Sequence, residues 1–107
     1  MRWIRIFKSV DEGIKAIPSG SSRQVIIGDF KLCLSNYENN FKASENSCPH
    51  LGEELHKGMV NYLGEIICPW HNYRFDLNSG AEADRRCSDL KLYQTKITEE
   101  GVFVCIP

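Results

Sequence analysis

Alternating hydrophobic and polar positions run through the chain and predict short β-strands. Residues 2–7 alternate so that Ile4 and Ile6 share one face, which is the period-2 pattern of a half-buried strand. Similar runs rich in β-branched and aromatic residues recur between Gly, Asn and Asp turn signals. We therefore predict further strands over residues 24–27, 31–35, 41–45, 59–62, 65–68, 73–76, 92–98 and 102–106.

The spacing of these runs indicates the fold class. A helical turn is expected only over residues 11–17, where Asp11 is the candidate cap and Pro18 ends the segment. Runs 59–62 and 65–68 are expected to form one hairpin, and runs 92–98 and 102–106 another. Many short strands at close spacing predict an all-β fold, either an antiparallel sandwich or a small barrel. At 107 residues the chain is predicted to form a single domain, residues 1–107.

Composition narrows the cellular setting. A net charge of −1 gives no indication of binding to nucleic acid or to an anionic membrane surface. Charges at Arg5 and Lys8 interrupt the apolar start, so it does not match a signal peptide. No run approaches the ~18 apolar residues of a membrane span, and we expect a cytoplasmic protein. Cys33 and Cys105 lie in strand-like runs and are expected to be small core residues, whereas Cys87 is assigned no function.

Two short segments carry the candidate chemistry, C-P-H at 48–50 and C-P-W-H at 68–71. Seventeen residues separate His50 from Cys68, enough for the chain to turn and return, so the segments can face each other as loops. A proline follows each cysteine and stiffens each loop. Zinc sites usually take two cysteines from one loop, whereas here each loop offers one thiol and one imidazole. We therefore expect a [2Fe-2S] cluster, with the inner iron on Cys48 and Cys68 and the outer iron on His50 and His71. A zinc-binding structural module is the less favoured alternative.

The same segments and their flanks resemble the Rieske-type iron–sulfur domain in its soluble, single-domain ferredoxin form. The resemblance rests on Cys48-Pro-His50-Leu-Gly52, Cys68-Pro-Trp-His71, Phe75-Asp76 and Asn78-Ser-Gly80. It implies a Rieske-like antiparallel β-sandwich or small barrel with an inserted cluster-binding subdomain, here about residues 46–76. It also implies one Rieske-type [2Fe-2S] cluster bound by the four residues at 48, 50, 68 and 71.

The resemblance implies an electron carrier and not an enzyme. A flavin- or ferredoxin-linked reductase would supply the electron, and a terminal oxygenase or other oxidoreductase would accept it. A complete oxygenase needs a second iron held by two histidines and a carboxylate. Only His56 remains after the expected ligands, so this chain cannot build that second site. A Rieske-like small subunit of a reductase complex, of the nitrite reductase type, is the alternative function.

Several neighbours of the expected ligands depart from relatives of this domain. Glu53 and Trp70 occupy the two positions where membrane-complex Rieske domains carry a bracing disulfide. Asn72 stands where the family usually has glycine, and asparagine is the next most tolerated residue at positive φ. Trp70 is expected to cover the cluster, to present a docking surface or to be a core residue. His56 is expected to be a solvated loop residue.

These departures predict a low reduction potential. In the membrane-complex branch a serine and a tyrosine donate hydrogen bonds to the cluster and its cysteine sulfur, and here Tyr73 and Phe75 occupy those positions. Hydrogen bonds to the sulfurs stabilise the reduced cluster and raise its potential. We therefore expect a midpoint of about −150 mV, not the +300 mV at the other end of the Rieske range. Voltammetry at neutral pH checks this, and a clearly positive midpoint would contradict it.

Overall fold

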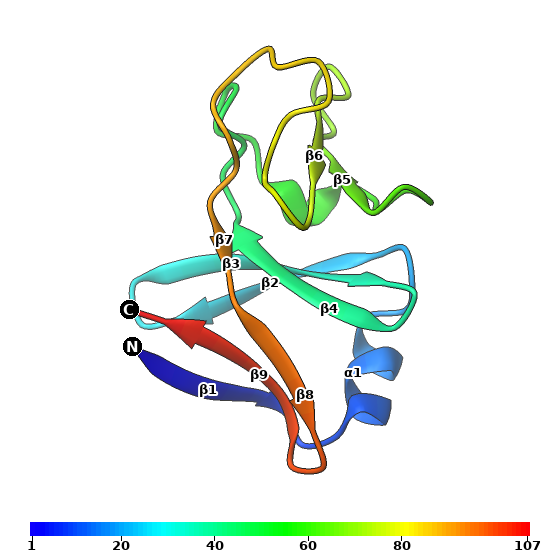
Figure 1. The fold of residues 1–107 in the computed structure, drawn as a ribbon, viewed down its shortest axis with the longest axis vertical. Helices are drawn as coiled ribbons and strands as arrows, with labels where there is room; N and C mark the ends of the chain where they lie inside the picture. The colour runs from blue at the N-terminus through cyan, green and yellow to red at the C-terminus, as the bar shows by residue number, and fades with distance from the viewer.

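Three antiparallel sheets build the molecule, and the computed structural model describes all of residues 1–107. The three-stranded sheet has the order β1 (Arg2–Phe7), β9 (Gly101–Ile106), β8 (Thr95–Thr98). The four-stranded sheet has the order β2 (Ser22–Ile27), β3 (Phe30–Tyr37), β4 (Asn40–Glu45), β7 (Leu92–Tyr93). The third sheet pairs β5 (Glu65–Ile67) with β6 (Arg74–Asp76). Figure 1 shows the four-stranded sheet between the other two, so the expected all-β antiparallel fold is confirmed.

Strand β3 is buried on both of its faces and joins the two halves of the molecule. Leu32 and Leu34 point into the core between the two larger sheets, which also contains residues of β4 and β9. Cys33, between them in sequence, belongs instead to a second core, because successive strand residues point to opposite faces. The four-stranded sheet thus supports a hydrophobic core on each side.

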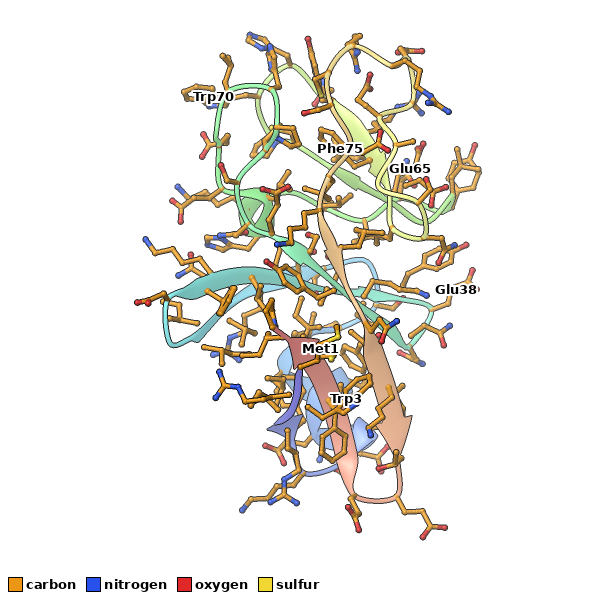
Figure 2. All side chains as sticks on the ribbon, turned by 60° about the vertical axis from the view of Figure 1, so that its left-hand side comes forward. Met1, Trp3, Glu38, Glu65, Trp70 and Phe75 are labelled. Atoms are coloured by element: carbon orange, nitrogen blue, oxygen red, sulfur yellow. The ribbon has the colours of Figure 1, made fainter.

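The second core lies in the segment between β4 and β7, residues 46–91, which we call the small subdomain. Its buried members are Cys48, Leu55, Val60, Ile66, Cys68, Phe75, Leu77 and Leu90, together with Cys33 from β3. Phe75 is completely buried and points inward in Figure 2. A short 3-10 helix, η1 (Leu55–Lys57), follows the first candidate loop. The segments expected to carry the chemistry therefore sit on a packed core and not on an isolated loop.

The single α-helix, α1 (Val10–Ala16), begins one residue before the predicted turn and has a different cap. The Ser9 Oγ accepts a hydrogen bond from the Glu12 amide at 3.1 Å, so Ser9 and not Asp11 is the cap. A serine three residues before a glutamate is a known capping signature. No helix in the structure has the length and apolar character needed to cross a membrane.

Two predicted hairpins form only in part. Residues 59–62 form only an isolated bridge between Val60 and Ile66, and β5 pairs with β6. The predicted strand 92–98 divides at Gln94: β7 pairs with β4, and β8 pairs with β9. The chain passes from one sheet to the other at this residue, whose carbonyl accepts a hydrogen bond from the Cys105 amide. Such a crossing closes one corner between the two larger sheets.

Candidate metal centre

Each of the two candidate loops is closed by an equivalent backbone hydrogen bond. The Cys48 amide donates to the Glu53 carbonyl at 2.9 Å, and the Cys68 amide donates to the Tyr73 carbonyl at 2.7 Å. In both loops the cysteine therefore bonds to the carbonyl five residues later. This closure holds the cysteine and the histidine of each loop on one tight turn.

Each loop also needs a left-handed residue at the fourth position after its cysteine. Gly52 has φ +79° in the first loop, and Asn72 has φ +55° in the second, where His71 also has a positive φ of +63°. Asparagine adopts this region more readily than most residues with a side chain. The expectation that Asn72 preserves the loop at positive φ is confirmed, and Asn72 is the structural equivalent of Gly52.

The loops bring the four predicted residues together as two pairs. Cys48 and Cys68 are buried in the core of the small subdomain, and the two thiols are close enough for Cys48 to raise the pKa of Cys68. The His50 and His71 rings lie nearer the surface with 5.3 Å between their centroids. His50 is half-buried and His71 is exposed. The donors thus divide into an inner thiol pair and an outer imidazole pair and do not surround one point.

This donor set fits a two-iron cluster. The His50 Nδ1 atom is buried and has no hydrogen-bond partner, although buried polar atoms are normally paired; a metal ion would satisfy it. Burial raises the pKa of the Cys68 thiol, and the neighbouring Cys48 thiol raises it further. Burial thus disfavours the Cys68 thiolate when no metal is bound, and a metal cation held there would compensate the thiolate's negative charge.

An aromatic stack beside His50 was not predicted from the sequence. The Tyr73 ring lies parallel to the His50 ring, with 3.9 Å between centroids and 11° between planes. The guanidinium carbon of Arg86 lies 3.8 Å from the centroid of the Tyr73 ring. Tyr73 occupies the position of a hydroxyl donor in the membrane-complex branch, but in this chain its ring stacks on the imidazole.

A buried carboxylate holds Arg86 in that position. Glu82 is 1% exposed, and its two oxygens accept hydrogen bonds from the Arg86 Nε at 3.0 Å and the Arg86 Nη2 at 2.7 Å. The Arg86 guanidinium, helped by the backbone amides of Arg86, Asp84 and Arg74, lowers the pKa of Glu82 to about 2 despite the opposing effect of burial. Residues 81–89 are polar and irregular as expected, and no periodicity in them marks this pair.

The other residues singled out from the sequence occupy varied environments. Trp70 is 51% exposed and projects outward in Figure 2, so it is not a core residue. His56 is half-buried and its Nδ1 is paired with the Asn46 amide at 2.8 Å, which corrects the expectation of a solvated side chain. Cys33 and Cys105 are buried as expected.

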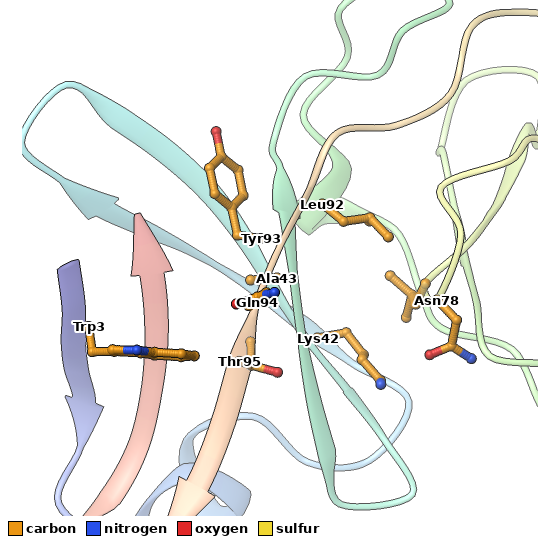
Figure 3. A pocket seen from close by; sticks show the side chains of 9 residues that line it. Trp3, Lys42, Ala43, Asn78, Leu92, Tyr93, Gln94 and Thr95 are labelled. Carbon is orange, nitrogen blue, oxygen red and sulfur yellow. The ribbon is translucent and has the colours of Figure 1, made fainter. Parts of the chain in front are cut away.

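A surface hollow of about 450 Å³ lies away from the candidate ligands. It spans the junction between the larger sheets and the small subdomain, and Figure 3 shows Trp3 at one end and Asn78 at the other. None of the four candidate ligands lines it. The chemistry of the chain is therefore not associated with this hollow.

Comparison with known proteins agrees with this geometry. A family model described as the Rieske [2Fe-2S] domain matches residues 9–94. The chain belongs to this family. The Rieske domain implies a [2Fe-2S] cluster, so the predicted family and cofactor are confirmed.

Two curated relatives show different contexts for this Rieske domain. The chain is 35% identical over 92 residues to human apoptosis-inducing factor 3, a match that covers 85% of this chain but only 15% of the relative. It is 30% identical over 89 residues to the ferredoxin component of the naphthalene 1,2-dioxygenase/salicylate 5-hydroxylase systems of a Ralstonia species. That match covers 82% of this chain and 85% of the ferredoxin. The second relative is thus a single-domain protein of about this length, whereas the first is several times longer.

Solved Rieske structures share the fold over nearly the whole chain. The ferredoxin of carbazole 1,9a-dioxygenase from Nocardioides aromaticivorans superposes with a TM-score of 0.81 at 20% identity, covering 97% of each chain. A chain from a complex of reduced oxygenase and oxidized ferredoxin in carbazole 1,9a-dioxygenase superposes with a TM-score of 0.78 at 25% identity. That match covers 95% of this chain and 91% of the other. A chain assigned as an NADH-dependent nitrite reductase small subunit from Mycobacterium tuberculosis superposes with a TM-score of 0.81 at 19% identity. That match covers 99% of this chain and 96% of the other. The predicted Rieske-like fold is confirmed.

The backbone at Asn72 yields a testable prediction for this Rieske domain. Asn72→Gly should leave the unfolding free energy within about 1 kcal/mol, because glycine adopts positive φ freely but loses more entropy on folding. Asn72→Val should lower it by about 1–2 kcal/mol, because a β-branched side chain is strained in the left-handed region. Denaturant unfolding of the purified protein measures both variants. Equal stabilities for the glycine and valine variants would contradict the loop geometry.

The pKa of Glu82 predicts an acid-dependent loss of stability. Because its pKa is about 2 in the folded protein against an ordinary value of 4.5, the ionised carboxylate stabilises the fold above the ordinary value. That contribution falls as the pH drops from 4.5 toward 2. Unfolding free energies of the wild type and of Glu82→Gln, measured from about pH 6 to about pH 3, should converge as the pH falls. A difference between the two proteins that stays constant across this range would show that the carboxylate is not preferentially ionised in the fold.

Proposed function

We propose that the chain is a one-electron carrier whose Rieske cluster is held by Cys48, Cys68, His50 and His71. Cys48 and Cys68 would bind the inner iron, and His50 and His71 the outer iron. The observation that carries this assignment is the division of the donors into a buried thiol pair and an outer imidazole pair. When bound, such a cluster accepts and donates one electron. Residues 1–107 would act as one domain, with the cluster held in the small subdomain.

The surface around the histidines supports electron exchange at this end of the molecule. His71 is exposed, and the neighbouring apolar side chains of Leu51 and Trp70 are 56% and 51% exposed. Exposed aromatic side chains are enriched where proteins dock. The thiol end, in contrast, is enclosed by the core of the small subdomain. A partner would therefore approach the imidazole end, where the protein separating it from the cluster is thinnest.

The partners follow from the relatives. The ferredoxin component from Ralstonia belongs to oxygenase systems, and the carbazole dioxygenase structures include complexes of oxygenase with ferredoxin. We propose a terminal oxygenase as the electron acceptor and a flavin- or ferredoxin-linked reductase as the donor. The chain would work in the cytoplasm.

The reductase-subunit alternative has one observation in its favour. The nitrite reductase small subunit superposes as closely as the carbazole dioxygenase ferredoxin, but at that low identity the match shows the fold alone. The ferredoxin relative from Ralstonia, with 30% identity over most of both chains, favours the oxygenase system. Stable co-purification with a large reductase subunit would reverse this preference.

The ligand set predicts a spectroscopic outcome. Purified protein should be brown and should give a rhombic Rieske-type EPR signal after anaerobic reduction with dithionite, because two imidazoles on one iron distinguish it from a cluster held by cysteines alone. Alanine at position 48, 50, 68 or 71 should abolish that signal, because one of the two irons then loses a ligand.

Two matched controls separate ligand loss from general damage. Cys105→Ala removes a buried thiol outside the small subdomain, and His56→Gln removes the third histidine. Both variants should keep the rhombic signal. A colourless wild-type protein that contains zinc would exclude the carrier function, and a rhombic signal that survives His50→Ala and His71→Ala would exclude the assigned ligands.

A further inference from the structure

Three side chains form a stack that ends on one of the proposed iron ligands. The Tyr73 ring is parallel to the His50 imidazole with 3.9 Å between their centroids. The Arg86 guanidinium lies 3.8 Å from the centroid of the Tyr73 ring. Since His50 occupies one face of that ring, the guanidinium occupies the other. The order of the stack is therefore Arg86, Tyr73, His50.

The outer end of the stack is fixed by an ion pair between Arg86 and the buried carboxylate of Glu82. Both oxygens of Glu82 accept from the Arg86 guanidinium, at 3.0 and 2.7 Å. A bidentate pair sets the plane of the guanidinium as well as its position. The Glu82 carboxylate is itself fixed, because it also accepts from the backbone amides of Asp84 and Arg86 at 3.1 and 2.9 Å.

The segment that carries this pair is attached to the small subdomain on both sides of Arg86. Before it, the Ala83 amide donates to the Arg74 carbonyl of β6 at 2.8 Å. After it, Cys87 packs against the core that contains Cys48 and Cys68. Arg86 is 36% exposed, so its outer edge reaches water while its flat face covers Tyr73. The segment that carries Arg86 is therefore anchored to the small subdomain and is not a free loop.

We propose that Glu82 and Arg86 form a clamp that presses Tyr73 against His50 and so sets the orientation of that imidazole toward the outer iron. Arg86 and Tyr73 are positioning residues, since they act through His50. The clamp is a net-neutral ion pair, but its positive half, the guanidinium, lies against the ring that contacts the ligand, where that charge favours the more negative, reduced form of the cluster. This inference rests on the proposed function, because it requires His50 to be an iron ligand.

Two neighbouring arginines offer a matched test. Arg86→Gln and Arg85→Gln each remove one positive charge from the same segment, but only Arg86 lies on the Tyr73 ring and pairs with Glu82. Pulsed EPR of the reduced, cluster-loaded protein reports the nitrogen couplings of the two imidazoles. Arg86→Gln should shift the nitrogen couplings of one imidazole, broaden the lines of the EPR signal and move the midpoint potential to more negative values. Arg85→Gln should leave the couplings unchanged and shift the potential less, because solvent screens its charge.

Two substitutions at Tyr73 separate the ring from its hydroxyl. Tyr73→Phe keeps the stacked ring and should retain the wild-type couplings, whereas Tyr73→Leu should reproduce the change seen in Arg86→Gln. If Arg86→Gln fails to load the cluster, Arg86→Lys replaces it. Lysine keeps the charge beside Glu82 but lacks the planar fork, so the couplings of one imidazole should still shift.

The outcomes separate this inference from the function on which it rests. A wild-type chain without a Rieske signal overturns the proposed function and the clamp together. If the wild-type chain gives the signal, but Arg86→Gln and Arg85→Gln have the same nitrogen couplings, the clamp alone is overturned. A Tyr73→Phe variant as altered as Tyr73→Leu also overturns it, because the hydroxyl and not the stack would then be responsible.

Discussion

The site depends on one repeated constraint: each cysteine amide must reach the carbonyl five residues ahead of it. This bond closes both loops, and each loop has a left-handed residue at its fourth position. These residues are Gly52 and Asn72, at φ +79° and +55°. Once both loops are closed, the thiols turn inward and the imidazoles outward. The division of donors that favours a two-iron cluster is thus a result of backbone geometry.

The loops can only face each other because they share a support. Cys33 on β3 and Phe75 on β6 belong to the same core as the two candidate cysteines, so the larger sheets and the small subdomain are packed together. Within the small subdomain, Gly58 lies directly against β5, because a side-chain carbon there would overlap the Ile67 carbonyl oxygen. A change in this core would alter the spacing between the loops, even though Phe75 and Gly58 are not among the proposed ligands.

The family and the positive φ of Asn72 could be predicted from the sequence because their signals are short. The four candidate ligands come from the same short motifs and stay a prediction. Errors arose where distant segments decide the outcome. Residues 59–62 have strand-like composition, but β5 takes β6 as its partner. The pattern of residues 92–98 predicts one strand, yet its first part pairs in the four-stranded sheet and its second part in the three-stranded sheet. Nothing within the run shows where it divides.

The Glu82–Arg86 pair was missed for a similar reason. Its residues lie in an irregular segment, and only the folded chain brings them against Tyr73 and β6. A charged residue in a polar stretch normally indicates exposure, but Glu82 is 1% exposed. The Ser9 cap differs, because its serine and Glu12 form a recognisable local signature. Long-range burial of a charge, in contrast, leaves no pattern in the sequence.

Burying a carboxylate beside a metal centre has a cost that the fold must offset. The desolvation of an ion is compensated only when charge-assisted hydrogen bonds occupy its oxygens, and Glu82 has both side-chain and backbone donors. An exposed Arg86 alone would keep many rotamers and could not hold a ring in one plane. Pairing it with a buried, ionised carboxylate removes that freedom. An electron carrier benefits from such rigidity, because ligands that hold their positions in both oxidation states leave less structural rearrangement to accompany each electron transfer.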